Sequence, residues 1–119
     1  MGNAVKFHKE GYNCAESIIK AANEDSNLNI PVSIGSPFGA GMATGNTCGA
    51  ITGTLMAIGA LKGRNSSDEK NDSMKITKEV INKVKEKYGT IECAQLKKNK
   101  VSCDEIIDFT YNTFKEHIK

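Results

Sequence analysis

Four cysteines are the side chains of this sequence best suited to redox or metal chemistry: Cys14, Cys48, Cys93 and Cys103. A thiolate is both a nucleophile and a metal ligand, and the unpaired N–H groups and dipole of a helix N-terminus favour it. A single free cysteine is most often a small buried hydrophobe. The residues around all four therefore have to be compared, because helix starts carry recognisable capping residues.

Two of the cysteines lie inside capping boxes. Residues 13–16 read NCAE and residues 102–105 read SCDE, so that Asn13 and Ser102 are the predicted caps and a glutamate lies three residues after each cap. In both segments the cysteine follows the cap directly. The sequence therefore predicts that Cys14 and Cys103 are the first residues of two helices.

The other two cysteines have weaker signals of the same kind. Cys48 follows two candidate caps, Asn46 and Thr47, and precedes an apolar run. Cys93 falls in the first turn of a short helix if Thr90 is the cap. All four thiols are thus predicted at helix N-termini, which is more than chance placement would give.

Three chemistries fit this arrangement. The interpretation we favour is one site in which all four cysteines ligate an iron–sulfur cluster for electron transfer. The second is thiol–disulfide chemistry with Cys48 as the nucleophile and Cys14 as its resolving partner. The third is a structural zinc ion bound by four thiolates. The spacing C-x33-C-x44-C-x9-C matches neither a zinc ribbon nor a ferredoxin run, so spacing alone does not choose between them.

Two glycines follow Cys48 at helical spacing. Gly49 and Gly53, together with Ala57, leave one helix face nearly without side chains. Glycine inside a helix is about 1 kcal/mol less favourable than alanine, so a close approach must offset it. The approaching group could be a second helix or an inorganic cofactor, and Gly49 and Gly53 are candidate cofactor-binding positions.

Composition limits the partners. The chain has 119 residues and a net charge of +2, which is too balanced to indicate nucleic acid or an anionic membrane. The N-terminal residues have no apolar core of a secretory signal, and residues 50–61 are too short to span a bilayer. We expect a cytoplasmic protein, and cysteines in a reducing cytosol point to metal or redox chemistry rather than static disulfides.

The elements that must position the thiols are helical, and the predicted fold is an all-α, small single-domain helical bundle spanning residues 1–119. A Gly-rich loop is expected over residues 25–47, with a short extended piece at 30–34. The predicted helices lie within residues 3–24 (broken at 11–13), 48–62, 76–88, 93–97 and 103–118. Residues 63–72 are predicted to be an exposed connection.

Other candidate residues are given structural roles. His8 and His117 are predicted to be solvated terminal positions rather than ligands or bases. Asp104 and Glu105 are explained by helix capping and dipole effects, and Tyr12 is predicted to be a core tyrosine. The glycines of GAGMATG lack the surrounding βαβ pattern of a dinucleotide site.

The strings GYNCAES, FGAGM and CGAITG, with two further cysteines, resemble the C_GCAxxG_C_C family of redox-active proteins over nearly the whole chain. The resemblance maps the family's cysteines onto Cys14, Cys48, Cys93 and Cys103, and its motif glycines onto Gly49 and Gly53. The cysteine region is also similar to part of split-Soret cytochrome c, which implies an iron–sulfur centre. No C-x-x-C-H haem attachment site is present.

The resemblance implies a redox role and a redox partner protein. It does not indicate a substrate-specific enzyme, and electron transfer is the favoured activity. The oligomeric state is not decided by the sequence, and a homodimer that brings two sites near each other is one alternative.

Overall fold

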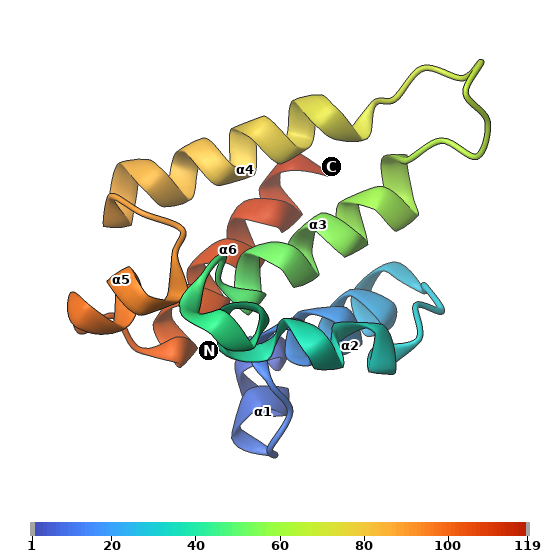
Figure 1. Cartoon of the computed structure of the whole chain (residues 1–119). Helices are drawn as coiled ribbons and strands as arrows, with labels where there is room; N and C mark the ends of the chain where they lie inside the picture. Colours follow the sequence, from blue (N-terminus) through green and yellow to red (C-terminus); the bar gives the residue numbers. More distant parts are fainter. Residues whose placement is uncertain (1, 119) are drawn as a thin grey trace.

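The computed structural model describes residues 2–118 and is all-α, with 73% of the chain in helices and no strand in that range. The predicted fold class is confirmed. Figure 1 shows the elements in chain order. They are α1 (Asn3–Lys9), α2 (Cys14–Ser26), the 3₁₀ helix η1 (Val32–Phe38), the irregular π-type turn η2 (Gly41–Gly45), α3 (Gly49–Lys62), α4 (Ser73–Tyr88), α5 (Cys93–Lys98) and α6 (Cys103–His117).

The start of α2 is fixed by the predicted capping box. The Asn13 side chain accepts from the Glu16 N–H at 2.8 Å, and the Glu16 carboxylate accepts from the Asn13 N–H at 2.9 Å. Ser36 donates to the same carboxylate at 2.5 Å, which ties η1 to α2. The hydroxyl of Ser36 and the N–H of Asn13 lower the pKa of Glu16. Cys14 is therefore held at the first position of a well-defined helix.

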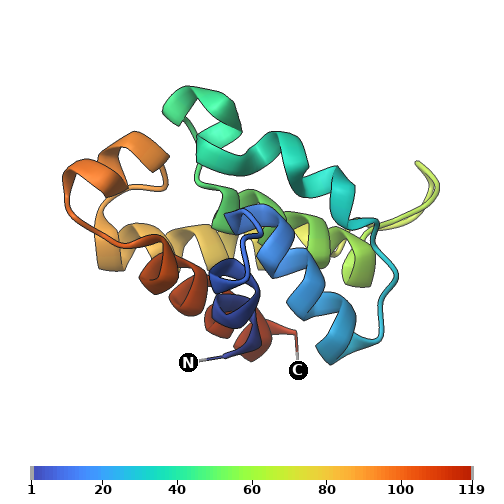
Figure 2. The ribbon, with the colours of Figure 1, turned by 90° about the horizontal axis from the view of Figure 1, so that it is seen from below.

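The core lies where α2, α3, α4 and α6 meet, and its largest fully buried side chains include Ile18, Ile51, Ile58, Ile107 and Phe114. Figure 1 shows α4 crossing the face formed by α3 and α6, and Figure 2 shows α1 beside α6. The amphipathic stripe predicted for α4 is borne out, because Val80 and Val84 are buried and Gly89 ends the helix with a left-handed φ of 77°. The long helices thus bury one face each, as the apolar periodicity predicted.

The segment before α3 differs from the prediction. Residues 32–38 form the 3₁₀ helix η1 rather than an extended piece within a loop. Gly35 is buried against α2, where an added Cβ would lie 2.9 Å from Ile19 Cδ1 and 3.0 Å from the Glu16 N atom. A compact helix that docks on α2 is favoured because Gly35 allows this close contact, which an isolated reading of the loop composition does not reveal.

The η2 turn is irregular and its backbone is largely left-handed, at Ala40, Gly41, Met42, Ala43 and Gly45. Such conformations are uncommon for residues other than glycine. In Figure 2 the η1–η2 segment lies over the starts of α2 and α3. Residues 63–72 form the exposed connection that was expected between α3 and α4. Within residues 2–118, every helix is too short or too polar to cross a membrane.

Candidate metal and redox site

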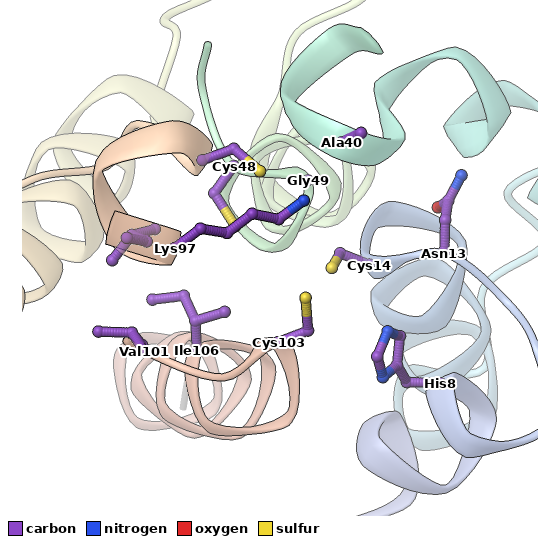
Figure 3. A pocket seen from close by; sticks show the side chains of 12 residues that line it. His8, Asn13, Cys14, Ala40, Cys48, Gly49, Lys97, Val101, Cys103 and Ile106 are labelled. Carbon is purple, nitrogen blue, oxygen red and sulfur yellow. The ribbon is translucent and has the colours of Figure 1, made fainter. Parts of the chain in front are cut away.

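The four cysteines line one cavity of about 170 Å³, although they lie far apart in the sequence. Cys14, Cys93 and Cys103 are the first residues of α2, α5 and α6, and Cys48 is the residue that caps α3. Figure 3 shows the sulfurs of Cys14, Cys48 and Cys103 facing the same space. Four helix starts thus place one thiol each at the same cavity, and all four are free thiols.

A short backbone bridge joins the start of α3 to the start of α5. The N–H of Cys48 donates to the Ile91 carbonyl at 2.8 Å, and the N–H of Cys93 donates to the Asn46 carbonyl at 2.6 Å. These two bonds flank the pair of Thr47 and Glu92. The bridge thereby holds Cys48 and Cys93 close together at the cavity, even though neither has a side-chain cap of its own.

Two of the predicted caps are wrong. Cys48 itself occupies the capping position of α3, where Asn46 and Thr47 had been the candidates. Glu92 occupies that position in α5, while Thr90 accepts the Glu92 N–H at 3.0 Å. The bridge explains both shifts, because it holds the residues before each cysteine in extended backbone.

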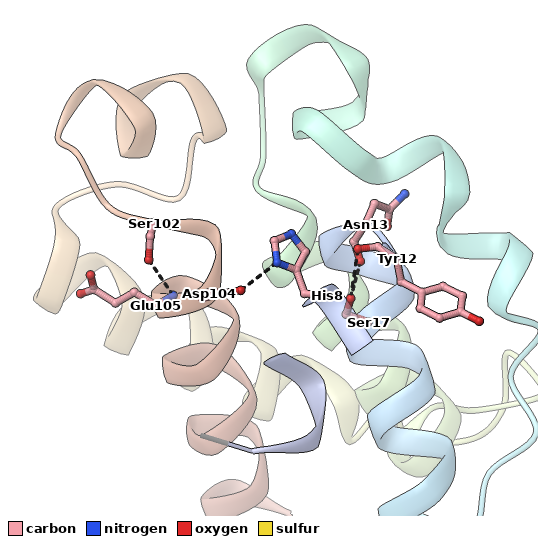
Figure 4. Close-up of polar contacts among 7 residues, drawn as sticks. All are labelled: His8, Tyr12, Asn13, Ser17, Ser102, Asp104 and Glu105. Carbon is pink, nitrogen blue, oxygen red and sulfur yellow. Dashed lines mark hydrogen bonds and ion pairs between the residues drawn. The ribbon is translucent and has the colours of Figure 1, made fainter. Parts of the chain in front are cut away.

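The cap of α6 is half of the predicted box. The Ser102 hydroxyl oxygen accepts from the Glu105 N–H at 3.0 Å, as expected (Figure 4). The Glu105 carboxylate instead accepts from the Tyr88 hydroxyl at 3.0 Å and so connects α6 to α4. Cys103 is nonetheless the first residue of α6, as predicted.

Cys48 is the acidic thiol of the cavity. Its pKa is lowered to about 7 because the Cys14 thiol donates a hydrogen bond to its sulfur and the N–H groups of Ala50 and Ile51 lie at the helix start, with Lys97 adding positive charge. Burial opposes this shift. The same hydrogen bond to Cys48, together with burial and the nearby Cys103, raises the pKa of Cys14. Near neutral pH a large fraction of Cys48 is therefore thiolate beside a protonated Cys14.

Cys93 has a different environment. Burial raises the pKa of its thiol, and the ammonium of Lys97 opposes that shift. Figure 3 shows the Lys97 side chain reaching across the cavity toward Cys48 and Gly49. The remaining lining is largely apolar and includes Leu96, Val101 and Ile106. A negatively charged group would find a cation and helix N-termini here, with little competing water.

The two motif glycines serve helix packing. A Cβ at Gly49 would lie 3.1 Å from the Cys14 Cβ and 3.0 Å from the Phe38 carbonyl oxygen. A Cβ at Gly53 would lie 2.9 Å from both the Cα and the carbonyl oxygen of Ala15. Gly49 also lines the cavity. The close approach predicted for this helix face is therefore the approach of α2, which brings Cys14 beside Cys48.

His8 lies at the site, contrary to the prediction of a solvated position. Its ring is only partly exposed and lines the cavity, and its Nδ1 lies 2.8 Å from Asp104 Oδ1 (Figure 4). The one signal in the sequence was the break at residues 11–13. It separates α1 from α2 and allows α1 to pack on α6. The direction of that turn depends on tertiary packing, so the sequence did not place His8 near the thiols.

Tyr12, predicted to be a core tyrosine, is half-buried and packs against the edge of the core. Its ring packs edge-on against Phe7, with centroids 6.3 Å apart, and the Lys20 ammonium lies 4.7 Å from the ring centroid. His117 is partly buried rather than solvated, and its Nδ1 lies 2.8 Å from the Thr113 carbonyl oxygen. These residues are structural.

The fold and the cavity define a small all-α protein in which two cysteines, Cys14 and Cys103, and His8 are grouped closely enough to bind a metal. Residues 12–117 match the family described as "Putative redox-active protein (C_GCAxxG_C_C)". The chain belongs to this family, as its motifs indicated. Neither the curated proteins nor the solved structures contain a match to it.

Proposed function

We propose that the protein transfers electrons through an iron–sulfur cluster ligated by Cys14, Cys48, Cys93 and Cys103. The observation that carries this proposal is that four thiols from four helix starts line a single cavity. Clusters are commonly ligated by four cysteine thiolates, and their protein ligands need not follow one another in the sequence.

The donor set fits such a cluster. Helix N-termini and the Lys97 ammonium supply positive potential for thiolates and for the negative charge of a cluster. The apolar side chains of Leu96, Val101 and Ile106 limit water around it. Hydrogen bonds and nearby charge tune cluster potentials, so the helix N-termini and the Lys97 ammonium favour the reduced form.

When bound, the cluster supplies one-electron redox chemistry. The chain itself holds the thiolates and limits their contact with water. Since Cys48 already has a pKa of about 7, it is available as a thiolate ligand near neutral pH, whereas Cys14 must release its proton on binding. A protein redox partner would exchange electrons at this end of the molecule, and a homodimer would set two such sites side by side.

The test is anaerobic purification followed by a visible spectrum and analysis of iron, sulfide and zinc. We expect a brown protein with matched iron and sulfide, and we expect Cys48→Ser and Cys93→Ser each to bleach it. His117→Ala is a matched control that is remote from the cavity. Full colour in both cysteine variants, or a protein that contains stoichiometric zinc and no iron after reconstitution, would rule the cluster out.

A second candidate function is thiol–disulfide exchange, and the Cys14–Cys48 contact favours it. The Cys48 thiolate would attack one sulfur of a partner disulfide, breaking that bond and releasing a partner thiolate. Cys14 would then lose its proton and attack Cys48, forming the Cys14–Cys48 disulfide and releasing the second partner thiolate. The partner gains two electrons and the protein loses two.

Mass spectrometry of the iron-free protein tests this alternative. After incubation with a glutathione redox series, a Cys14–Cys48 disulfide should form reversibly with one defined midpoint. Cys93→Ser should leave that midpoint unchanged, in contrast to its effect on a cluster. If mixed disulfides form at random among the four cysteines, the exchange function is wrong.

A further inference from the structure

His8 reaches the cavity from an element that carries no cysteine. It lies near the end of α1, which packs on α2 and α6, and its ring is next to Cys14 and Cys103 in Figure 3. One nitrogen of His8 and the sulfurs of these two cysteines all lie within 4.8 Å of one another. Residues 2–118 contain no other group of three or more His, Cys, Asp or Glu donors as close as this.

These separations suit a single metal ion. Zinc binds sulfur at about 2.3 Å and nitrogen at about 2.0–2.1 Å, so tetrahedral ligands lie about 3.5 Å apart. Donors within 4.8 Å of one another need shift by only about 1 Å to share one ion. Zinc, iron and cobalt bind well to thiolate and imidazole ligands, whereas magnesium and calcium prefer oxygen ligands.

The histidine is already oriented for binding. Its Nδ1 lies 2.8 Å from the Asp104 carboxylate. Because a carboxylate accepts, the neutral tautomer that fits this contact carries the proton on Nδ1 and the lone pair on Nε2. Metal-binding histidines commonly donate their other N–H to a carboxylate, which fixes the ring and its tautomer. Asp104 directly follows Cys103 in the first turn of α6, so one helix start holds a ligand and the residue that positions another ligand.

Helix tethering alone is the competing explanation of this pair. The contact between His8 and Asp104 joins α1 to α6, and both side chains are only about one-third exposed or less, at 27% and 31%. Tethering requires the contact between these two residues only. It does not require the ring to lie beside two thiols, and that placement is what points to a metal.

We propose that His8, Cys14 and Cys103 form a three-ligand site for one divalent transition-metal ion, with Asp104 as the residue that positions His8. Three protein ligands leave a fourth position for water or another small ligand. This site is distinct from the four-thiolate zinc site considered from the sequence, because it uses an imidazole and does not use Cys93. It also does not depend on the cluster, although the two would compete for Cys14 and Cys103.

The test is a titration of the full-length, reduced, metal-free chain with Co²⁺, followed by competition with Zn²⁺. A tetrahedral site with thiolate ligands gives visible d–d bands and a near-ultraviolet charge-transfer band. We expect one ion per chain. Asp104→Asn should weaken binding by about 10- to 100-fold, as is typical of residues that orient metal ligands, and His8→Ala should weaken it further.

The cysteine variants separate this proposal from the cluster. Cys14→Ser and Cys103→Ser should abolish tight binding of Co²⁺, whereas Cys48→Ser and Cys93→Ser should change the affinity by only a few-fold. Cluster assembly, measured on the same variants, should require Cys48 and Cys93. The proposal of the three-ligand site and the proposal of the cluster can therefore be disproved independently.

A matched variant guards against misfolding. His8→Cys keeps a ligand at this position and should restore Co²⁺ binding with a stronger charge-transfer band than the parent. Circular dichroism checks that each variant keeps its helices. Unchanged affinity in His8→Ala, or a loss in Cys93→Ser as large as that in Cys14→Ser, would overturn the three-ligand site.

Discussion

The cavity has two walls that are built in different ways. The first is made by two regular helices that meet in the core, and we call it the α2–α3 wall. In it Cys14, Cys48 and Gly49 line the cavity, and Gly53 lies in the helix contact behind them. The second is made by a six-residue helix and the irregular η2 turn, and we call it the α5 wall. In it Cys93, Leu96 and Lys97 line the cavity, and Gly41 of η2 packs on Cys93 from behind.

The two walls place their thiols by different physical means. On the α2–α3 wall, missing side chains at Gly49 and Gly53 let two helices approach until Cys14 and Cys48 touch. On the α5 wall, left-handed backbone at Gly41 lets η2 pass directly over Cys93. Helix packing therefore fixes the sulfurs of Cys14 and Cys48, and local backbone conformation fixes the sulfur of Cys93. The difference predicts that substitutions in the two walls will fail in different ways.

The largest expected effect is that of Gly53→Val in the α2–α3 wall. A Cβ at this position would lie 2.9 Å from the Ala15 backbone, which cannot rotate away as a flexible side chain could. Overpacking of a core costs typically 1–3 kcal/mol, and we expect about 3 kcal/mol here. Urea unfolding followed by circular dichroism measures it.

Gly59→Ala is the matched control in the same helix. No atom lies within 4 Å of a Cβ built at Gly59. Alanine should raise the free energy of unfolding by about 0.5–1 kcal/mol, because it restricts the unfolded chain and favours the helix. If Gly53→Val were as stable as the parent protein, close helix packing would not be what positions Cys14 beside Cys48.

A smaller effect is expected for Gly41→Ala in the α5 wall. Gly41 has a φ of 63°, and an added Cβ would lie 2.7 Å from the Cys93 Cβ and 2.6 Å from the Asn46 carbonyl oxygen. We expect a loss of about 2 kcal/mol, within the 1–3 kcal/mol range of strained backbone positions. The loss should be smaller than for Gly53→Val because η2 lies at the surface and can move outward.

The outward movement has a signature of its own. Cys93 is 9% exposed, so alkylation of this thiol in the folded protein should become faster in Gly41→Ala. Gly45→Ala is the control, since Gly45 also has a left-handed φ but its Cβ would lie 3.3 Å from Ala94 rather than against Cys93. Equal alkylation of Cys93 in both variants would show that η2 does not cover the α5 wall through Gly41.

The same contrast explains what the sequence could predict. Capping residues and apolar periodicity act within one or two turns, and they were enough to place Cys14 and Cys103 at helix starts. They also predicted α4 and its end at Gly89. The α2–α3 wall could be predicted to this extent because glycine spacing in α3 signals close packing before the partner helix is known.

The α5 wall and His8 depend on contacts between distant segments. The bridge between Thr47 and Glu92 moves the caps of α3 and α5, and nothing near either residue signals that pairing. Residues 32–38 fold as a helix because Gly35 docks on α2. His8 reaches the cavity through the packing of α1 on α6. These features arise from tertiary packing, which local sequence patterns do not encode.

The two walls also differ in how they affect the pKa of Cys48. Of the substitutions considered, Cys14→Ala should change this pKa most. The hydrogen bond from Cys14 is the largest cause of the low Cys48 pKa of about 7. Without that donor, the pKa should rise, so a smaller fraction of Cys48 is thiolate at neutral pH. Ultraviolet absorbance of the thiolate, followed against pH in the metal-free protein, measures the midpoint.

Cys14→Ser is the control for this prediction. A hydroxyl at position 14 can still donate to the Cys48 sulfur, so the midpoint should stay closer to that of the parent than in Cys14→Ala. The sign is fixed by the chemistry: a donor stabilises the thiolate and lowers the pKa, and removal of the donor raises it. A midpoint that stays near pH 7 in both variants would assign the acidity of Cys48 to the start of α3.

The smallest effect is expected from Lys97→Met, which removes the only charge that the α5 wall directs at Cys48. Lys97 is the last of the causes that lower the Cys48 pKa, and its exposed ammonium is screened by water and salt. The midpoint should therefore rise less than in Cys14→Ala, and the difference from the parent should shrink as salt is added. The pKa of Cys93, which Lys97 also lowers, should rise in the same titration. A larger shift for Lys97→Met than for Cys14→Ala would reverse the comparison, because the α5 wall rather than the helix pair would then control the reactive thiol.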